Sequence, residues 1–134
     1  MSVTAKWSSG LDFEGRDRHQ NVIQLSGETS RGYKPLELFL LGLAGCTGMD
    51  VISILQKKKQ NVSAFTVEVS GVRADEHPRV YTSIHVTYNV TGVGIDPKAV
   101  ERAVELSETK YCPASAMLSK SVAITHTINI VNEA

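Results

Sequence analysis

The alternation of apolar and polar positions predicts three strands at the start of the chain. Residues 3–8 and residues 11–14 alternate, and Gly10 lies between them, which is typical of a β-hairpin. Residues 21–26 predict a third strand, after a polar turn that carries two arginines. The first part of the chain is therefore expected to form a small antiparallel sheet.

The second half of the chain shows the same period-two pattern over longer stretches. Residues 64–72 and 79–90 alternate cleanly, and the turn at residues 75–78 joins them as a long hairpin. Residues 122–130 predict a last strand close to the end of the chain. These stretches predict a second sheet.

Between these sets of strands, residues 36–59 carry the strongest helical pattern, and Pro35 suits the first turn of a helix. The first half of this helix is apolar almost all round, so most of its faces should be buried. Gly42, Gly45 and Gly48 would each cost about 0.5–1 kcal/mol relative to alanine inside a helix. Their spacing indicates close approach of another backbone, and so apolar a helix in so small a chain indicates a partner subunit.

Two further helices are predicted in the second half. Asp96 is a typical N-cap and Pro97 a typical first helical residue, so a helix should run from there to about residue 109. A short helix should begin at Pro113. The order of strands, long helix, hairpin, helices and strand predicts the α+β class, with 1–134 as a single domain.

Charge and length narrow the functional classes. Formal net charge is zero, which argues against a nucleic-acid partner. The apolar uncharged run at residues 38–49 is shorter than a membrane span. The N-terminus shows no apolar signal-peptide region, so we expect a cytoplasmic protein. In a reducing cytosol, two cysteines are not expected to form a structural disulfide, and a disulfide that does form there is more often catalytic or redox-sensing.

Several kinds of chemistry lack support in the sequence. No two of the four histidines and two cysteines have zinc-ligand spacing, so we expect no metal site. The chain has neither the G-x-S-x-G elbow of serine hydrolases nor a phosphate-binding P-loop. The thiols remain as the candidate chemistry.

The two cysteines, Cys46 and Cys112, are 66 positions apart (112 minus 46). Cys46 lies within the long helix, where inert packing is the plain alternative. Cys112 precedes Pro113 as a candidate N-cap, and a helix N-terminus favours a thiolate. Local physics therefore favours Cys112 as the reactive thiol, whereas Cys46 would need a nearby cation. Arg16 or Arg18 could supply it, although either could equally be a solvated surface charge.

Both cysteine segments resemble those of one known family. Residues 35–50 (PLELFLLGLAGCTGMD) resemble the first cysteine helix of the OsmC/Ohr family, and residues 111–115 (YCPAS) resemble its second cysteine motif. The order of elements agrees over nearly the whole chain. The resemblance implies an OsmC/Ohr-like fold, with antiparallel sheets around a long central helix and two chains in an intertwined homodimer.

The resemblance also implies an activity, the thiol-dependent reduction of organic hydroperoxides in oxidative-stress defence. Cys46 would be the nucleophile that attacks the peroxide, and Cys112 would resolve the resulting sulfenic acid to a disulfide. An external dithiol would then reduce that disulfide. No metal or organic cofactor is implied.

In the family, an arginine and a glutamate surround the nucleophilic thiol. Arg16 or Arg18 would be this arginine. Leu36 stands where peroxidase members carry the glutamate, and Glu37 comes one residue later. This departure keeps an alternative open, in which the same dimer is a non-enzymatic redox sensor or binds a small apolar ligand. A further alternative is a stable dimer in which both cysteines are relics.

Overall fold

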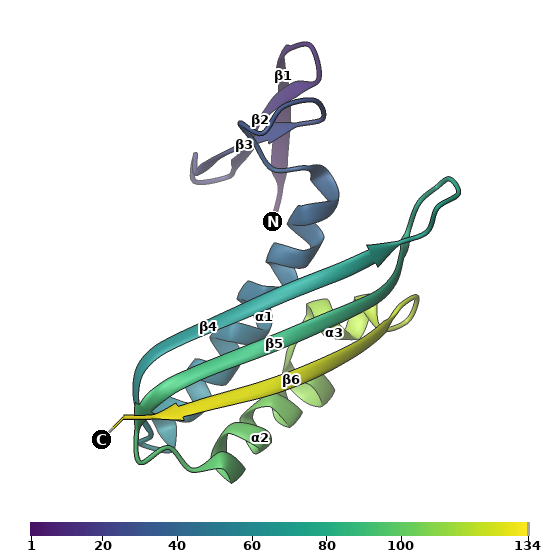
Figure 1. Cartoon of the computed structure of the whole chain (residues 1–134). Helices are drawn as coiled ribbons and strands as arrows, with labels where there is room; N and C mark the ends of the chain where they lie inside the picture. Colours follow the sequence, from purple (N-terminus) through teal and green to yellow (C-terminus); the bar gives the residue numbers. More distant parts are fainter. Residues whose placement is uncertain (134) are drawn as a thin grey trace. The chain divides into compact units, whose positions relative to one another are not determined.

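The computed structural model describes residues 1–133, and its contacts divide the chain into two compact units. The N-terminal unit comprises residues 1–39, and the C-terminal unit begins at Leu40. Figure 1 labels most of the elements along the chain. In chain order, the elements are β1 (Val3–Ser9), β2 (Asp12–Asp17), β3 (Val22–Ser26), α1 (Pro35–Lys57), β4 (Asn61–Arg73), β5 (Tyr81–Val93), α2 (Pro97–Leu106), the π-helical turn η1 (Ser107–Tyr111), α3 (Pro113–Leu118) and β6 (Ala123–Asn132).

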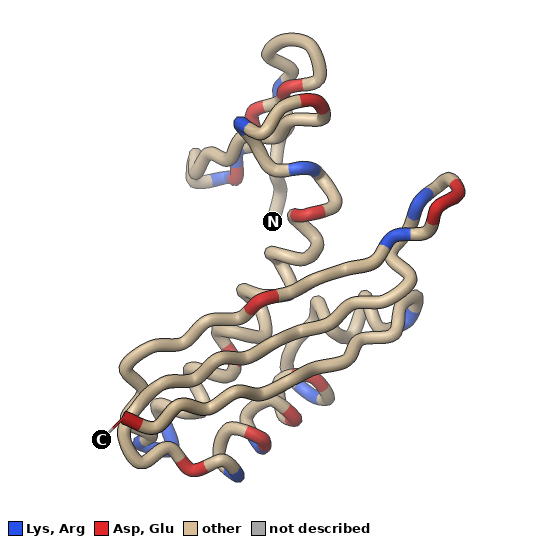
Figure 2. Tube along the Cα trace, viewed as in Figure 1, with Lys and Arg blue, Asp and Glu red and all other residues tan. Residues whose placement is uncertain are grey.

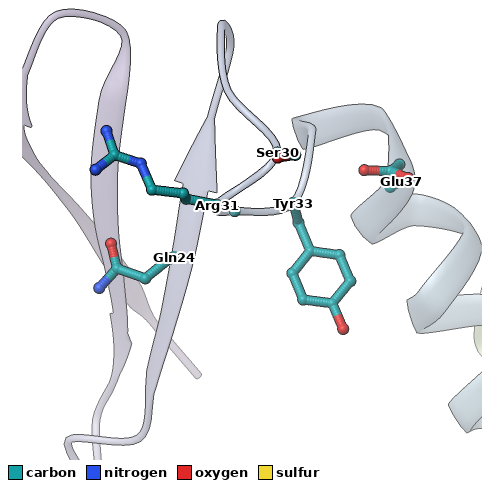
Figure 3. Close-up of a pocket in the computed structure, with 6 residues that line it drawn as sticks. Gln24, Ser30, Arg31, Tyr33 and Glu37 are labelled. Carbon is teal, nitrogen blue, oxygen red and sulfur yellow. The ribbon is translucent and has the colours of Figure 1, made fainter.

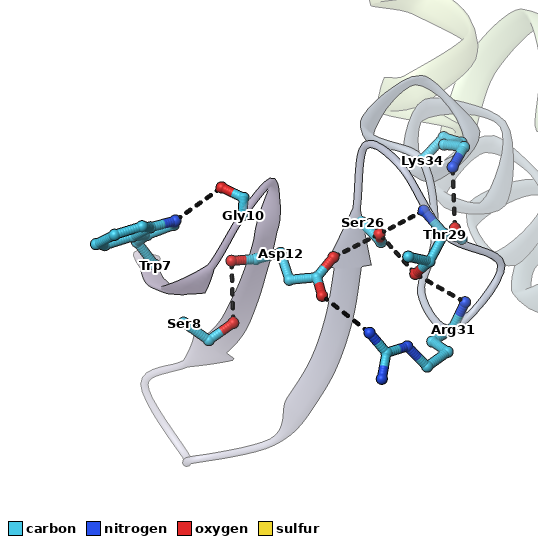
Figure 4. Close-up of polar contacts among 8 residues, drawn as sticks. All are labelled: Trp7, Ser8, Gly10, Asp12, Ser26, Thr29, Arg31 and Lys34. Carbon is cyan, nitrogen blue, oxygen red and sulfur yellow. Dashed lines mark hydrogen bonds and ion pairs between the residues drawn. The ribbon is translucent and has the colours of Figure 1, made fainter.

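The N-terminal unit is built on the antiparallel sheet β1-β2-β3, which confirms the predicted hairpin and third strand. Polar side chains hold the loop after β3 against this sheet (Figure 4). The Ser26 hydroxyl donates to Asp12 and is also bonded to Thr29, and Arg31 pairs with Asp12 at 3.6 Å. This network fixes the loop that leads into α1.

The C-terminal unit has a second three-stranded sheet of order β4-β5-β6. β4 and β5 form the predicted long antiparallel hairpin, but β6 lies parallel to β5, so this sheet is mixed and not wholly antiparallel as expected. The reason is the connection: residues 94–122 cross over the sheet through α2, η1 and α3 before the chain returns.

The helices of the C-terminal unit all cover one face of the second sheet (Figure 1). Along α1, the fully buried side chains recur every fourth residue, as expected for one helical face against a sheet. The core that they join contains Leu43, Val51, Leu55, Ile84, Val86, Tyr88, Val90, Ile95, Ala99, Val100, Ala103, Val104, Cys112 and Val122. This core sets the positions of both cysteine segments.

Helix α1 has 23 residues, and its most apolar stretch reaches a mean hydropathy of 1.9, so by length and composition alone it could span a membrane. Core helices of globular proteins have the same character, and α1 buries one face in the core described above. Charged residues of the C-terminal unit gather along α2 and at the tip of the β4–β5 hairpin, away from most of the α1 trace (Figure 2).

The predicted helices are confirmed, with one change of consequence. Asp96 caps α2 by accepting the Lys98 N–H at 3.0 Å, as predicted. α2 ends at Leu106, however, and the chain continues as the π-helical turn η1 up to Cys112. Single π-helical turns are often found at functional sites.

Candidate thiol site

The fold brings the two cysteines together. Cys46 comes from the middle of α1 and Cys112 from the joint between η1 and α3, and their Sγ atoms are 2.9 Å apart. Both thiols are free. A disulfide bond is about 2.05 Å long, so the sulfurs need to approach by less than about 1 Å to form one.

Cys112 is held tightly by its surroundings. It is 3% exposed and, as predicted, caps α3: its Sγ accepts the Ser115 N–H at 3.3 Å. Its own N–H donates to the Ser107 carbonyl at 2.8 Å, which closes η1. Cys112 is thus fixed at both its backbone and its sulfur.

Cys46 is partly buried and is the more exposed of the two cysteines. Burial, above all, raises the pKa of the Cys46 thiol, and the adjacent Cys112 and the Asp50 carboxylate raise it further, whereas the Ala114 N–H lowers it. None of these influences is a cation. The C-terminal unit of one chain therefore holds Cys46 largely as the neutral thiol near neutral pH.

A carboxylate that sequence reasoning missed lies beside the pair. Asp50 is four residues after Cys46 on α1, and its Oδ2 accepts the Ser107 hydroxyl at 3.0 Å. Ser107 is fully buried. The only sequence signal was the spacing of four, which places Asp50 and Cys46 on one side of the helix.

A second polar cluster holds η1 against the sheet. The Glu108 carboxylate accepts the Tyr88 hydroxyl at 3.2 Å and contacts His126 Nδ1 at 3.0 Å. Burial, with the Glu108 charge, raises the pKa of Tyr88, so its hydroxyl stays protonated and remains a donor. No sequence motif marks this cluster, since its members come from β5, η1 and β6.

The candidate arginines belong to the N-terminal unit. Arg16 lies on β2, where its Nε contacts Glu14 Oε1 at 2.6 Å, and it lines an apolar cavity of about 330 Å³. Arg18 follows β2 in the turn and bonds the His19 ring at 3.1 Å. Arg18 also lines a mostly apolar hollow, of about 420 Å³, with Met1 and Val3, so both arginines border apolar surface.

Glu37 has a local partner at the start of α1. Its Oε1 accepts the Lys34 N–H at 2.8 Å, as in a capping box, so the carboxylate stabilises the helix N-terminus. Figure 3 shows Glu37 beside a hollow of about 370 Å³ that Gln24, Ser30, Arg31 and Tyr33 also line. A role for Glu37 in chemistry stays a prediction.

Comparison with known proteins gives a consistent result. The OsmC-like protein family model matches residues 27–127. Protein YhfA of Escherichia coli K12 is 39% identical over 132 residues, which cover 98% of each chain. The crystal structure of a hypothetical protein from Aquifex aeolicus has a TM-score of 0.83 at 31% identity, with 96% of both chains covered.

A more distant structure is the organic hydroperoxide resistance protein OhrB of Bacillus subtilis. Its TM-score is 0.63 at 20% identity, with 96% of both chains covered, so this likeness concerns the fold. The family match covers most of the chain, and the YhfA match covers nearly all of it. The chain therefore belongs to the OsmC-like protein family.

Proposed function

We propose that the protein reduces organic hydroperoxides with Cys46 and Cys112 as a redox pair. The observation that carries the proposal is the 2.9 Å distance between two sulfurs that are 66 residues apart in the chain. If the cysteines only packed in the core, they would not need to contact each other. A dithiol cycle, in contrast, requires the two sulfurs to be in contact. Membership of a family whose fold OhrB shares also supports a peroxide-related redox role.

The exposure of the two cysteines supports a division of roles between them. Cys46 is the more exposed cysteine, so it meets the peroxide, and the buried Cys112 acts second. The Cys46 thiolate attacks the O–O bond of ROOH, which forms Cys46–SOH and releases RO⁻, and RO⁻ takes a proton to become ROH. Cys112–SH then condenses with Cys46–SOH to form the disulfide and water. An external dithiol reduces this disulfide and is itself oxidised to a disulfide.

We propose that a guanidinium of the N-terminal unit activates Cys46 in the assembled protein. The raised pKa of Cys46 creates the need for a cation. Arg16 is our first candidate because it lies on strand β2 and lines the hollow with the more apolar walls, where an apolar peroxide tail would be sheltered. The thiol cycle also requires a reducing compartment, so we propose that the protein is cytoplasmic.

The proposal predicts a defined oxidised product. Treatment of the reduced protein with one equivalent of cumene hydroperoxide should lower its intact mass by two hydrogens, because the sulfurs are already almost in bonding range. With dithiothreitol present, the protein should consume many equivalents of peroxide, as measured by ferrous-xylenol orange. A protein whose thiols stay reduced under these conditions would contradict the proposal.

The alternative function, a redox sensor or a binding protein for a small apolar ligand, has two supporting observations. Burial raises the pKa of Cys46, which slows a peroxidase, and the cavity beside Arg16 is mostly apolar. A sensor would lose two hydrogens on oxidation but would show no sustained peroxide consumption with a dithiol. The same pair of measurements therefore distinguishes the two functions.

We also propose that the protein is a homodimer that covers the outer face of α1. Leu41 is 47% and Met49 is 74% exposed, and the Cβ positions of Gly42 and Gly45 have open space around them. On this face, Gly45, Met49 and Ile52 line a shallow apolar groove of about 360 Å³ together with β4 residues. A second copy of the same helix would bury this surface, and the glycines would permit close approach.

A Met49→Asp substitution should weaken this dimer, because it places a charge at the centre of the apolar face. Light scattering coupled to size exclusion should give twice the chain mass for the wild type and a larger share of the single-chain mass for the variant. Lys58→Gln, at the exposed end of the helix region, is the control because it changes the net charge by the same single unit. A wild type that runs as a single chain at all concentrations would refute the homodimer.

A further inference from the structure

We propose that Asp50 and Ser107 are positioning residues that hold Cys112 in reach of Cys46 for disulfide closure. This inference rests on the proposed function, but it concerns residues that neither cysteine motif contains. Asp50 shares α1 with Cys46, and Ser107 begins the turn that ends at Cys112. Their hydrogen bond therefore links the two segments from which the thiols project.

The contacts form a closed ring. From Cys46, one turn of α1 leads to Asp50, whose Oδ2 accepts the Ser107 hydroxyl at 3.0 Å. The Ser107 carbonyl accepts the Cys112 N–H at 2.8 Å, and the ring closes through the 2.9 Å contact between the sulfurs. Ser107 thus uses its side chain toward one cysteine segment and its backbone toward the other.

Burial makes this ring stiff. Ser107 is fully buried and Cys112 is 3% exposed, so water has little access to the bond between them, and the Ser107 end of the bond to the half-buried Asp50 is also shielded. Glu108, the next residue, is bonded to Tyr88 on β5 and His126 on β6. The turn before Cys112 is therefore held between α1, which carries Cys46, and the sheet.

Asp50 has a second effect, which slows the first step of the cycle. Its negative charge near Cys46 opposes formation of the thiolate. The residue thus favours disulfide closure while disfavouring the first attack. A residue with a purely structural role would not produce opposite changes in two steps, so the two steps give the proposal a distinctive signature.

Three variants separate the hydrogen bond from the charge. Asp50→Asn keeps an acceptor for Ser107 and removes the charge, Asp50→Ala removes both, and Ser107→Ala removes the hydrogen bond and keeps the charge. Two rates are measured on the full chain at neutral pH. The first is alkylation of Cys46 by iodoacetamide, and the second is the unimolecular closure phase that follows mixing with excess oxidant.

The expected pattern is specific. Both Asp50 variants should alkylate faster than the wild type, by about two- to fivefold, because a nearby negative charge is lost. Closure should slow by about tenfold or more in Asp50→Ala and Ser107→Ala, since small misplacements of reacting groups are costly. Asp50→Asn should close about as fast as the wild type, which is the rescue by a conservative change.

Closure is measured with two oxidants, cumene hydroperoxide and diamide, so that the test does not depend on the proposed peroxide reduction. With diamide, Cys46 adds to the N=N bond and Cys112 then displaces the hydrazine as the disulfide forms, so closure is measured without a peroxide. Closure that follows the expected pattern with diamide supports the positioning role even where hydroperoxide is not reduced. Unchanged closure in Ser107→Ala, or closure as slow in Asp50→Asn as in Asp50→Ala, would overturn it. Circular dichroism establishes that each variant is folded, and Ser107→Ala decides the matter should Asp50→Ala unfold.

Discussion

A Cys46→Ser variant is expected to lose hydroperoxide reduction almost entirely, by at least about a thousandfold. Cys46 is the more exposed cysteine of the pair, and a serine hydroxyl at the same position is a far weaker nucleophile toward a peroxide oxygen. Cys112 cannot take over the first step, because it is 3% exposed within the core. The measurement is peroxide consumption with cumene hydroperoxide and dithiothreitol under conditions in which the wild type turns over.

The matched control is Cys112→Ser. This variant should still react once with peroxide, and its Cys46 sulfenic acid should be trapped by dimedone as a mass adduct, because the resolving thiol is absent. Cys46→Ser should give no such adduct. Equal peroxide consumption by Cys46→Ser and the wild type would contradict the assignment of the nucleophile, and an adduct on Cys112 would reverse the two roles.

Much of the fold could be predicted because its signals are local. The alternation in β4 and β5, the apolar run of α1 and the Asp96–Pro97 start of α2 each reside within a single segment. The direction of β6 could not be predicted in this way. An alternating strand has the same pattern whether it runs parallel or antiparallel to its neighbour, and only the crossover through residues 94–122 determines which.

The site was predictable only in part, because contacts between distant segments leave no local signal in the sequence. The cap formed by Cys112 on α3 is local and was predicted from Pro113. The meeting of Cys46 with Cys112 came from a family resemblance, since neither segment encodes the other. The Asp50–Ser107 bond joins residues 57 positions apart and has no motif, so it emerged only from the structure.

The role of Arg16 can be tested by its effect on the acidity of Cys46. In Arg16→Ala, we expect reaction of Cys46 with hydroperoxide to slow by about tenfold or more at neutral pH, since a cation within a few ångströms strongly favours a thiolate. The sign follows from the surroundings of the sulfur: burial, Cys112 and Asp50 raise the pKa of Cys46, the Ala114 N–H offsets this only in part, and a nearby positive charge would lower the pKa further. The pH profile of Cys46 alkylation should therefore shift to higher pH in the variant, with an unchanged plateau where the thiol is fully ionised.

Two matched variants make this result specific. Arg18→Ala should leave the profile within about twofold of the wild type, because Arg18 lies in an exposed turn after β2, where water screens its charge. Arg16→Lys keeps the charge but loses the planar fork, so it should recover part of the shift. A profile shift in Arg18→Ala and none in Arg16→Ala would transfer the role to Arg18. Unshifted profiles in both would mean that Cys46 works without an arginine, which with its raised pKa favours a slow redox sensor over an efficient peroxidase.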